Sequence, residues 1–250
     1  MRSLAWAVGL TFVGSLGGVL VASALLLFND QIRLKVVPWL VSYAVGTLLG
    51  VALLVLLPEA LSQLPARTVL GALLGGIILF YVLEKLVLWR HCHTHDCEAH
   101  GMAAPMVLFG DAFHNFLDGV VIGTAVQTSV PLGVSTALAV ATHEIPQELG
   151  DFAILLDAGY SREKALVLNI VSGLSAILGA VLAVVALDWM PRISQYILSV
   201  AAASFLYVAM ADLIPDLHRG RIDARTLREL VLAAAGIFTV VALNTFLGEH

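Results

Sequence analysis

Long apolar runs separated by short polar stretches dominate the chain. Crossing the ~30 Å hydrocarbon core of a bilayer takes about 20 apolar residues in a helix, and backbone groups in lipid must pair within their own segment. The runs that meet this requirement are approximately 4–28, 39–61, 68–89, 105–127, 131–157, 164–187, 194–214 and 228–247. The pattern therefore predicts an all-α integral membrane protein with eight transmembrane helices, in which residues 1–250 form a single transmembrane domain.

Composition supports this class, and the positions of Lys and Arg give an orientation. Hydrophobic residues make up 60% of the 250 positions and charged residues 12%, against roughly a quarter charged in soluble domains.

Lys and Arg accumulate in cytoplasmic loops. The predicted helices leave Arg2, Arg67 and Arg192 on one side and place the rest on the other, namely Arg33, Lys35, Lys85, Arg90, Arg162, Lys164, Arg219, Arg221, Arg225 and Arg228. We therefore expect a plasma (inner) membrane protein with both termini outside and the 90–104 loop in the cytoplasm. The net charge of −5 gives no reason to expect a nucleic-acid partner.

Two short motifs indicate internal symmetry. "LLPEAL" (56–61) ends the second predicted helix and "LIPDL" (213–217) ends the seventh, each with a proline followed by an acid. The second helix runs outward and the seventh inward, so the matched ends lie on opposite faces. We expect a 3+2+3 arrangement in which helices 1–3 and 6–8 are inverted repeats, as in many secondary transporters.

Polar side chains interrupt the fourth and fifth predicted helices, at "HNFLDG" (114–119) and "HEIPQELGD" (143–151). Residues three or four apart share a helix face, and a rise of 1.5 Å per residue places His114 and His143 near the membrane midplane. Ionisable residues there cost about 3 kcal/mol each and normally face a cavity or a pathway. Pro146 cannot donate to the Thr142 carbonyl, so we expect a kink or a freed carbonyl beside His143.

The same two helices carry carboxylates without a basic partner. A lone membrane His or Asn is often an interhelical hydrogen-bonding residue, and a lone Asp often pairs with Lys or Arg. No Lys or Arg occurs between Arg90 and Arg162. A bound divalent cation is therefore the natural counter-charge. The acids concerned are Asp111, Asp118, Glu144, Glu148 and Asp151.

The 90–104 loop is rich in zinc-type ligands. A reducing cytoplasm argues against a structural disulfide between its two cysteines, and the composition suits zinc. The alternative is a polar loop that happens to carry histidines. The candidate metal-binding residues are His91, Cys92, His93, His95, Cys97 and His100.

The paired motifs resemble the fourth- and fifth-helix signatures of the ZIP (Zrt/Irt-like) divalent metal transporters, nearest to the branch with HNxxDG and HExPHExGD. "LLPEA", "EKLVLWRHCH" and "ADLIPDLH" extend the resemblance over nearly the whole chain. The resemblance implies transport of zinc into the cytoplasm, and also of iron, manganese or cadmium. Zn²⁺ would then be the transported substrate, with no organic cofactor.

The resemblance also implies site residues. His114, Asp118 and His143 would be ligands of a first metal site, with Asn115 and Glu144 turned toward an adjacent second one. Departures from the family pattern leave open whether the site holds one ion or two. Gln147 stands where the branch usually has His, and Ala176 stands where some members have a glutamate.

Residues around that site would line the pathway. Asp111, Glu148 and Asp151 lie above and below it, and His218 with the loop ligands could receive the ion on the cytoplasmic side. The resemblance implies an elevator-type movement of helices 1, 4, 5 and 6 against helices 2, 3, 7 and 8, commonly in a homodimer.

Two other classes compete with a transporter. An intramembrane zinc protease needs HExxH, and Gln147 leaves that ligand pair incomplete, so we do not expect an enzyme. A structural metal site would be closed, and would give no reason for the acids strung beside it.

Overall fold

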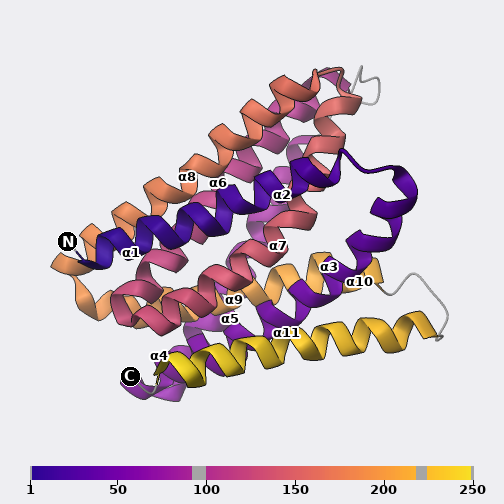
Figure 1. Cartoon of the computed structure of the whole chain (residues 1–250). Coiled ribbons are helices and arrows are strands. Elements are labelled where there is room, and N and C mark those ends of the chain that lie inside the picture. Colours follow the sequence, from indigo (N-terminus) through magenta and orange to yellow (C-terminus); the bar gives the residue numbers. More distant parts are fainter. Residues whose placement is uncertain (1, 92–99, 218–223, 249–250) are drawn as a thin grey trace.

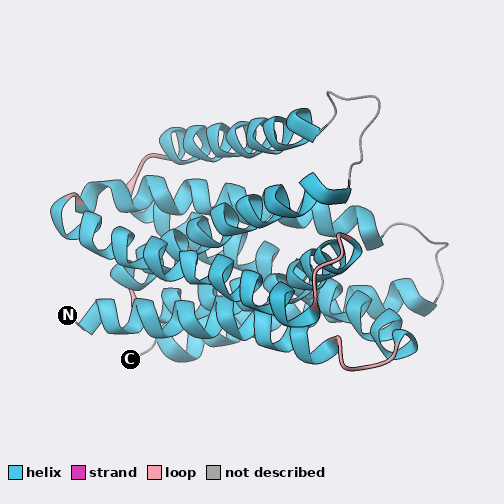
Figure 2. Ribbon diagram, turned by 90° about the horizontal axis from the view of Figure 1, so that it is seen from above, coloured by secondary structure: helices cyan, strands magenta, loops and turns pink. Residues whose placement is uncertain are grey.

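The computed structural model describes residues 2–91, 100–217 and 224–248, and within these ranges the regular structure is helical throughout, with no strand (Figure 2). Six segments of the described residues are long and apolar enough to cross a membrane: Arg2–Leu25, Leu34–Gln63, Ala66–Lys85, Arg162–Trp189, Pro191–Leu213 and Arg225–Leu247. The prediction of an all-α membrane protein is confirmed.

Two further helices have the length but not the apolar composition. α6 (His100–Thr128) has 29 residues and α7 (Val130–Asp157) has 28, so each exceeds the roughly 20 residues that a bilayer requires. They contain the two polar motifs, whose acids and histidines lower their mean hydropathy.

The other helices follow the predicted runs to within a few residues, with one exception. They are α1 (Arg2–Thr11), α2 (Gly17–Leu25), α3 (Asp30–Val51), α4 (Leu57–Gln63), α5 (Ala66–His91), α8 (Arg162–Trp189), α9 (Ser194–Tyr207), α10 (Ile214–Leu217) and α11 (Ala224–Gly248). The exception is α3, which begins at Asp30 and not near residue 39. The Asn29 side chain accepts a hydrogen bond from the Ile32 amide (3.0 Å) and caps a polar first turn.

Short non-α turns interrupt three of these runs. η1 (Phe12–Leu16), η2 (Ala52–Leu56) and η4 (Val208–Leu213) are π-helical, and η3 (Pro191–Ile193) is a 3-10 turn before α9. Pro58 and Pro215 lie two residues after η2 and η4 respectively. A helical proline clashes with the carbonyl four residues before it, and π turns are a known way for a helix to absorb such a disruption. α7, by contrast, stays helical through Pro146.

The helices form two groups with α7 between them (Figure 1). In one group α1 and α2 pack with α6 and α8. In the other α3 packs with α11, and α5 packs with α9. α7 contacts α2 and α6 on one side and α3 and α11 on the other. The two ends of the chain lie at the same end of the molecule (Figures 1 and 2).

The α6–α8 pair is held at very short range by glycines. A Cβ atom on Gly119 would overlap the Ala176 carbonyl oxygen of α8, and one on Gly179 would overlap the Phe116 carbonyl oxygen of α6. Ser175 Oγ also donates to the Ala112 carbonyl oxygen across this interface (2.6 Å). Small residues let membrane helices approach closely. α8 therefore packs directly against α6 and supports the helix that carries His114 and Asp118.

This packing predicts opposite effects of one substitution at two positions on α6. Gly119→Ala should lower the free energy of unfolding by about 1–3 kcal/mol, as overpacking typically does. Gly110→Ala should raise it by up to about 1 kcal/mol through helix propensity, because no described atom lies within 4 Å of the added methyl group. Thermal unfolding in detergent without metal measures both, and equal effects would contradict the close contact.

Candidate metal centre

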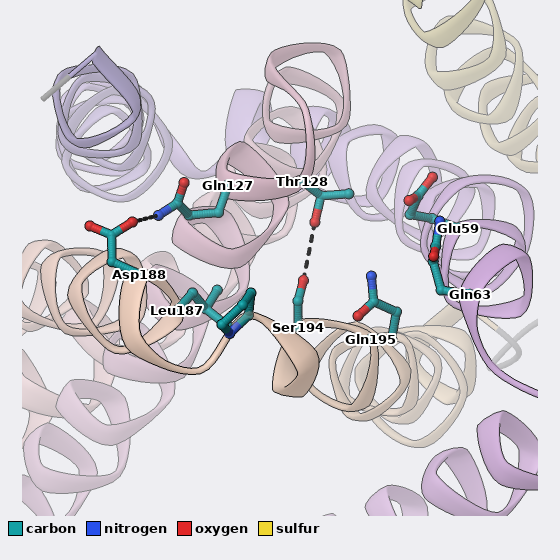
Figure 3. A pocket seen from close by; sticks show the side chains of 9 residues that line it. Glu59, Gln63, Gln127, Thr128, Leu187, Asp188, Ser194 and Gln195 are labelled. Carbon is teal, nitrogen blue, oxygen red and sulfur yellow. Dashed lines mark hydrogen bonds between the residues drawn. The ribbon is translucent and has the colours of Figure 1, made fainter.

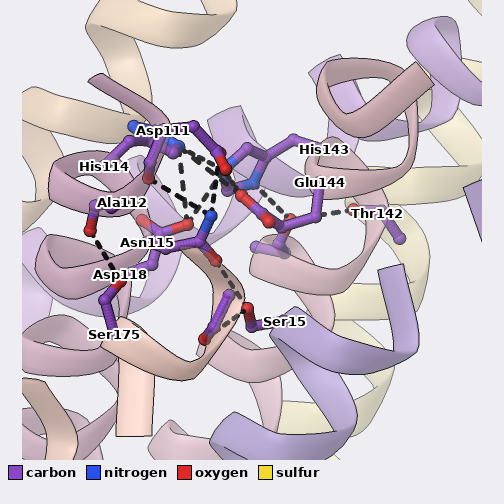
Figure 4. Close-up of polar contacts among 12 residues, drawn as sticks. Ser15, Asp111, Ala112, His114, Asn115, Asp118, Thr142, His143, Glu144 and Ser175 are labelled. Atoms are coloured by element: carbon purple, nitrogen blue, oxygen red, sulfur yellow. Dashed lines mark hydrogen bonds and ion pairs between the residues drawn. The ribbon is translucent and has the colours of Figure 1, made fainter. Parts of the chain in front are cut away.

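The two histidines that we predict near the membrane midplane lie side by side. His114 of α6 and His143 of α7 place their Nε2 atoms 3.2 Å apart (Figure 4). Their rings are nearly perpendicular, at an interplanar angle of 86°. The similar membrane depths inferred for His114 and His143 from the sequence therefore predicted correctly that the two side chains are neighbours.

Two carboxylates complete a compact group, which we call the His114 cluster: His114, Asp118, His143 and Glu144. Asp118 Oδ2 lies 3.1 Å from His143 Nε2 and 3.6 Å from His114 Nε2. Glu144 Oε1 lies 3.7 Å from His114 Nε2 and 3.9 Å from His143 Nε2. One atom from each residue lies within 4.8 Å of the other three. Two imidazoles and two carboxylates are a ligand set that suits tetrahedral zinc.

The cluster is buried except at one member. Asp118, His143 and Glu144 are at most 1% exposed, whereas 20% of the His114 side chain is accessible. His114 is therefore the one accessible member of the cluster. Two buried carboxylates without Lys or Arg in their helices are stable only when protons or a cation neutralise them.

The orientation of His143 is fixed by its neighbours. Its Nδ1 lies 2.9 Å from the Ala139 carbonyl oxygen, so Nδ1–H donates there and Nε2 is the ring nitrogen that faces the cluster. Metal-binding histidines generally donate their other ring N–H in this way. The Phe205 ring of α9 packs edge-on against His143 at 6.0 Å between centroids.

Asn115 is occupied by other partners. Its Oδ1 accepts a hydrogen bond from Ser15 Oγ (2.5 Å), and its Nδ2 donates to Asp111 Oδ1 (2.9 Å). Ser15 lies in the π turn η1, which brings the first helical run against α6. The amide therefore ties α6 to the first run and orients Asp111.

A polar pocket of about 510 Å³ lies at the far end of α6, between α4, α6, α8 and α9 (Figure 3). Glu59 and Asp188 face it from opposite sides. Gln127 Nε2 donates to Asp188 Oδ1 (2.8 Å), and the Thr128 and Ser194 hydroxyls lie 3.2 Å apart. The pocket separates the two helix groups at this end.

Comparison with known proteins identifies the family. Residues 89–244 match the family model described as "ZIP Zinc transporter". The chain belongs to the ZIP zinc transporter family. The resemblance inferred from the two polar motifs is thus confirmed at the level of the family.

Individual ZIP relatives match over different lengths. The chain is 41% identical to human zinc transporter ZIP10 over 132 residues, which cover 52% of this chain and 16% of ZIP10. It is 32% identical to zinc transporter ZIP13 of Pongo abelii, with 83% of this chain and 66% of ZIP13 covered. For zinc transporter YKE4 of Saccharomyces cerevisiae the identity is 29%, with coverages of 89% and 73%. The chain thus spans only a small part of human ZIP10.

The remaining predicted residues of this ZIP chain lie in different settings. Gln147 is half-buried one turn after His143, and Glu148 is fully buried beside it. Ala176 is fully buried against Gly119, and its methyl group offers no ligand. His91 and His100 lie at helix ends and their side chains are not described. Outside the described residues lie Cys92, His93, His95, Cys97 and His218.

Sequence reasoning missed two supporting residues, Ser15 and Phe205. Ser15 is a hydroxyl in an otherwise apolar run, which is a weak signal because such serines usually bond to their own helix. Phe205 has no signal at all, since an aromatic residue in an apolar run looks like any core residue.

Gln147 provides a test of the ligand set of this ZIP chain. Replacing it by His or Glu should tighten zinc binding, because an amide oxygen gives way to a stronger ligand one turn from His143. Gln147→Ala should not tighten it, which controls for the loss of the amide alone. Calorimetric titration measures the affinity, and unchanged binding in both the His and Glu variants would show that position 147 does not face the ion.

Proposed function

We propose that this ZIP chain carries zinc across a membrane into the cytoplasm, with the His114 cluster as the site that binds the ion on the way. The observation that supports this most is the convergence of four ligand atoms within 4.8 Å between two membrane-length helices. Relatives named as zinc transporters support the choice of ion. Iron, manganese and cadmium also accept imidazole and carboxylate ligands and are further candidate substrates.

Transport fits the cluster better than a structural role. A structural zinc site is closed, with all its ligands in place. Here His114 is partly accessible, and further acids lie along the same helices. Zinc hydrolysis of the HExxH type lacks its second histidine at Gln147.

The proposed topology has eight membrane crossings with both termini outside. α6 and α7 join the six apolar spans as central crossings, and the shared position of the two chain ends supports an even number. The π turns before Pro58 and Pro215 support inverted repeats of the first three and last three crossings. The distribution of Lys and Arg supports an orientation in the plasma (inner) membrane with the 90–104 loop on the cytoplasmic side.

The pocket at Glu59 and Asp188 suits an outer vestibule, because it lies at the end of the molecule near both termini. On the cytoplasmic side of the proposed topology, His218 and the His and Cys residues of the loop would receive the ion. Thiolates and neutral imidazoles are the forms of these side chains that bind zinc, and binding can order the segment that carries them.

The two helix groups support an elevator-type movement. α1, α2, α6, α7 and α8 would move together against α3, α4, α5, α9 and α11. In the part of the chain that the structure describes, few polar links cross the boundary between them, such as Thr47 Oγ1 to Thr142 Oγ1 (2.7 Å). We propose that two copies of the chain form a homodimer. In each copy, residues 1–250 form a single membrane domain.

The proposal predicts that either histidine is essential for flux. His114→Ala or His143→Ala should abolish high-affinity zinc uptake into proteoliposomes, because each removes an imidazole from the cluster. Phe113→Ala, next to His114 but exposed to the outside of the helix bundle, should retain uptake and serves as the control.

Folding must be separated from function in this test. Detergent-purified variants should elute as the unsubstituted chain does in size-exclusion chromatography. Normal zinc uptake by a folded His114 or His143 variant would contradict the proposed function.

A further inference from the structure

A second set of acids lies beyond the His114 cluster and contributes no atom to it. Asp111 lies one turn before His114 on α6, while Glu148 and Asp151 follow Glu144 on α7. α6 and α7 are joined by a short turn and run in opposite directions. All three acids therefore lie on the side of the cluster away from that turn, toward the end where α6 begins.

Glu148 gives the clearest sign of a missing cation. Its side chain is 0% exposed, and among the described residues neither of its carboxylate oxygens accepts a hydrogen bond. Asp111 and Asp151 lie close enough for their negative charges to act on it. An unpaired buried carboxylate is strongly unfavourable.

Asp111 is held so that one oxygen stays available. It is 4% exposed, and Asn115 Nδ2 donates to its Oδ1 at 2.9 Å. Its Oδ2 has no hydrogen-bond donor within the described part of the chain. Ser172 of α8 lies beside it, with its hydroxyl 3.4 Å from the Leu108 carbonyl oxygen.

The chemistry of this set differs from that of the His114 cluster. It offers oxygen atoms alone. The sequence has no Lys or Arg between Arg90 and Arg162, so α6 and α7 supply no basic side chain to neutralise these acids. Oxygen ligands favour hard divalent cations such as Mn²⁺, whereas imidazole favours zinc.

We propose that Asp111, Glu148 and Asp151 form a second divalent-cation site, an oxygen-only station between the His114 cluster and the end of the molecule where α6 begins. In the described ranges, only the His114 cluster brings at least three candidate ligand atoms within 4.8 Å of one another. The three acids therefore do not form a closed ligand set, and water would have to complete the ligand shell of an ion held there. Weak binding at successive sites lets an ion move on.

The role of the station in passage rests on the proposed transport of zinc, but cation binding does not. Mn²⁺ is the probe because it favours oxygen ligands. The purified full-length chain is first loaded with zinc, which fills imidazole and thiolate sites, and then titrated with Mn²⁺ while EPR measures the free ion.

We expect the zinc-loaded chain to bind one Mn²⁺. The double variant Asp111→Asn, Glu148→Gln should lose this binding and keep its zinc. Asp157→Asn removes an exposed acid at the end of α7 and should bind Mn²⁺ like the unsubstituted chain. His114→Ala should lose zinc flux and keep the Mn²⁺ site, which separates this proposal from the proposed function.

Absence of Mn²⁺ binding to the zinc-loaded chain would overturn the station, whether or not zinc is transported. Unchanged Mn²⁺ binding in the double variant would also overturn it. Retained zinc loading shows that the double variant is folded. If loading is lost, Glu148→Gln alone replaces it, and the same loss of Mn²⁺ binding is required.

Discussion

Negative charge buried in α6 and α7 without a basic side chain is the constraint on which the rest of the structure depends. Asp118, Glu144 and Glu148 are essentially inaccessible, and the sequence offers no Lys or Arg from the end of α5 to the start of α8. Such an arrangement is stable in a membrane only if protons or a cation neutralise it. In the proposed function, a divalent cation supplies this positive charge while it is bound.

The packing around α6 and α7 follows from the same constraint. Ligand atoms must be held within a few tenths of an ångström to favour an ion, and lipid gives no hydrophobic driving force for helix association. Gly119 and Gly179 supply close contact between α6 and α8, while Ser15 and Ala139 orient Asn115 and His143 through hydrogen bonds. α7 also contacts the second helix group, so the cluster lies near the boundary at which movement is proposed.

Much of this could be predicted from the sequence, and the omissions have physical causes. Apolar runs locate membrane helices because the bilayer imposes one length and one backbone pattern. The meeting of His114 with His143 followed from depth alone, because α6 and α7 are joined by a short turn. The start of α3 at Asp30 was missed. The cap at Asn29 lets the helix begin in polar sequence, where a search for apolar runs finds no helix.

Contacts between segments far apart in the sequence were the hardest to predict. Ser15 and Asn115 are far apart in sequence, and nothing in either motif specifies their hydrogen bond. The π turns at η2 and η4 depend on how Pro58 and Pro215 are accommodated, which periodicity does not reveal. The ligand role of Asn115 and Gln147 stays a prediction, since the position of an amide relative to an ion depends on the ion.

X-ray absorption at the zinc edge tests the central claim most directly. The chain would carry Cys92→Ser and Cys97→Ser, to remove thiolates, and one equivalent of zinc. The account predicts imidazole nitrogen and carboxylate oxygen ligands at about 2.0–2.2 Å, with the imidazole contribution lost in the additional His114→Ala, His143→Ala variant. An imidazole shell that survives removal of both histidines would contradict it.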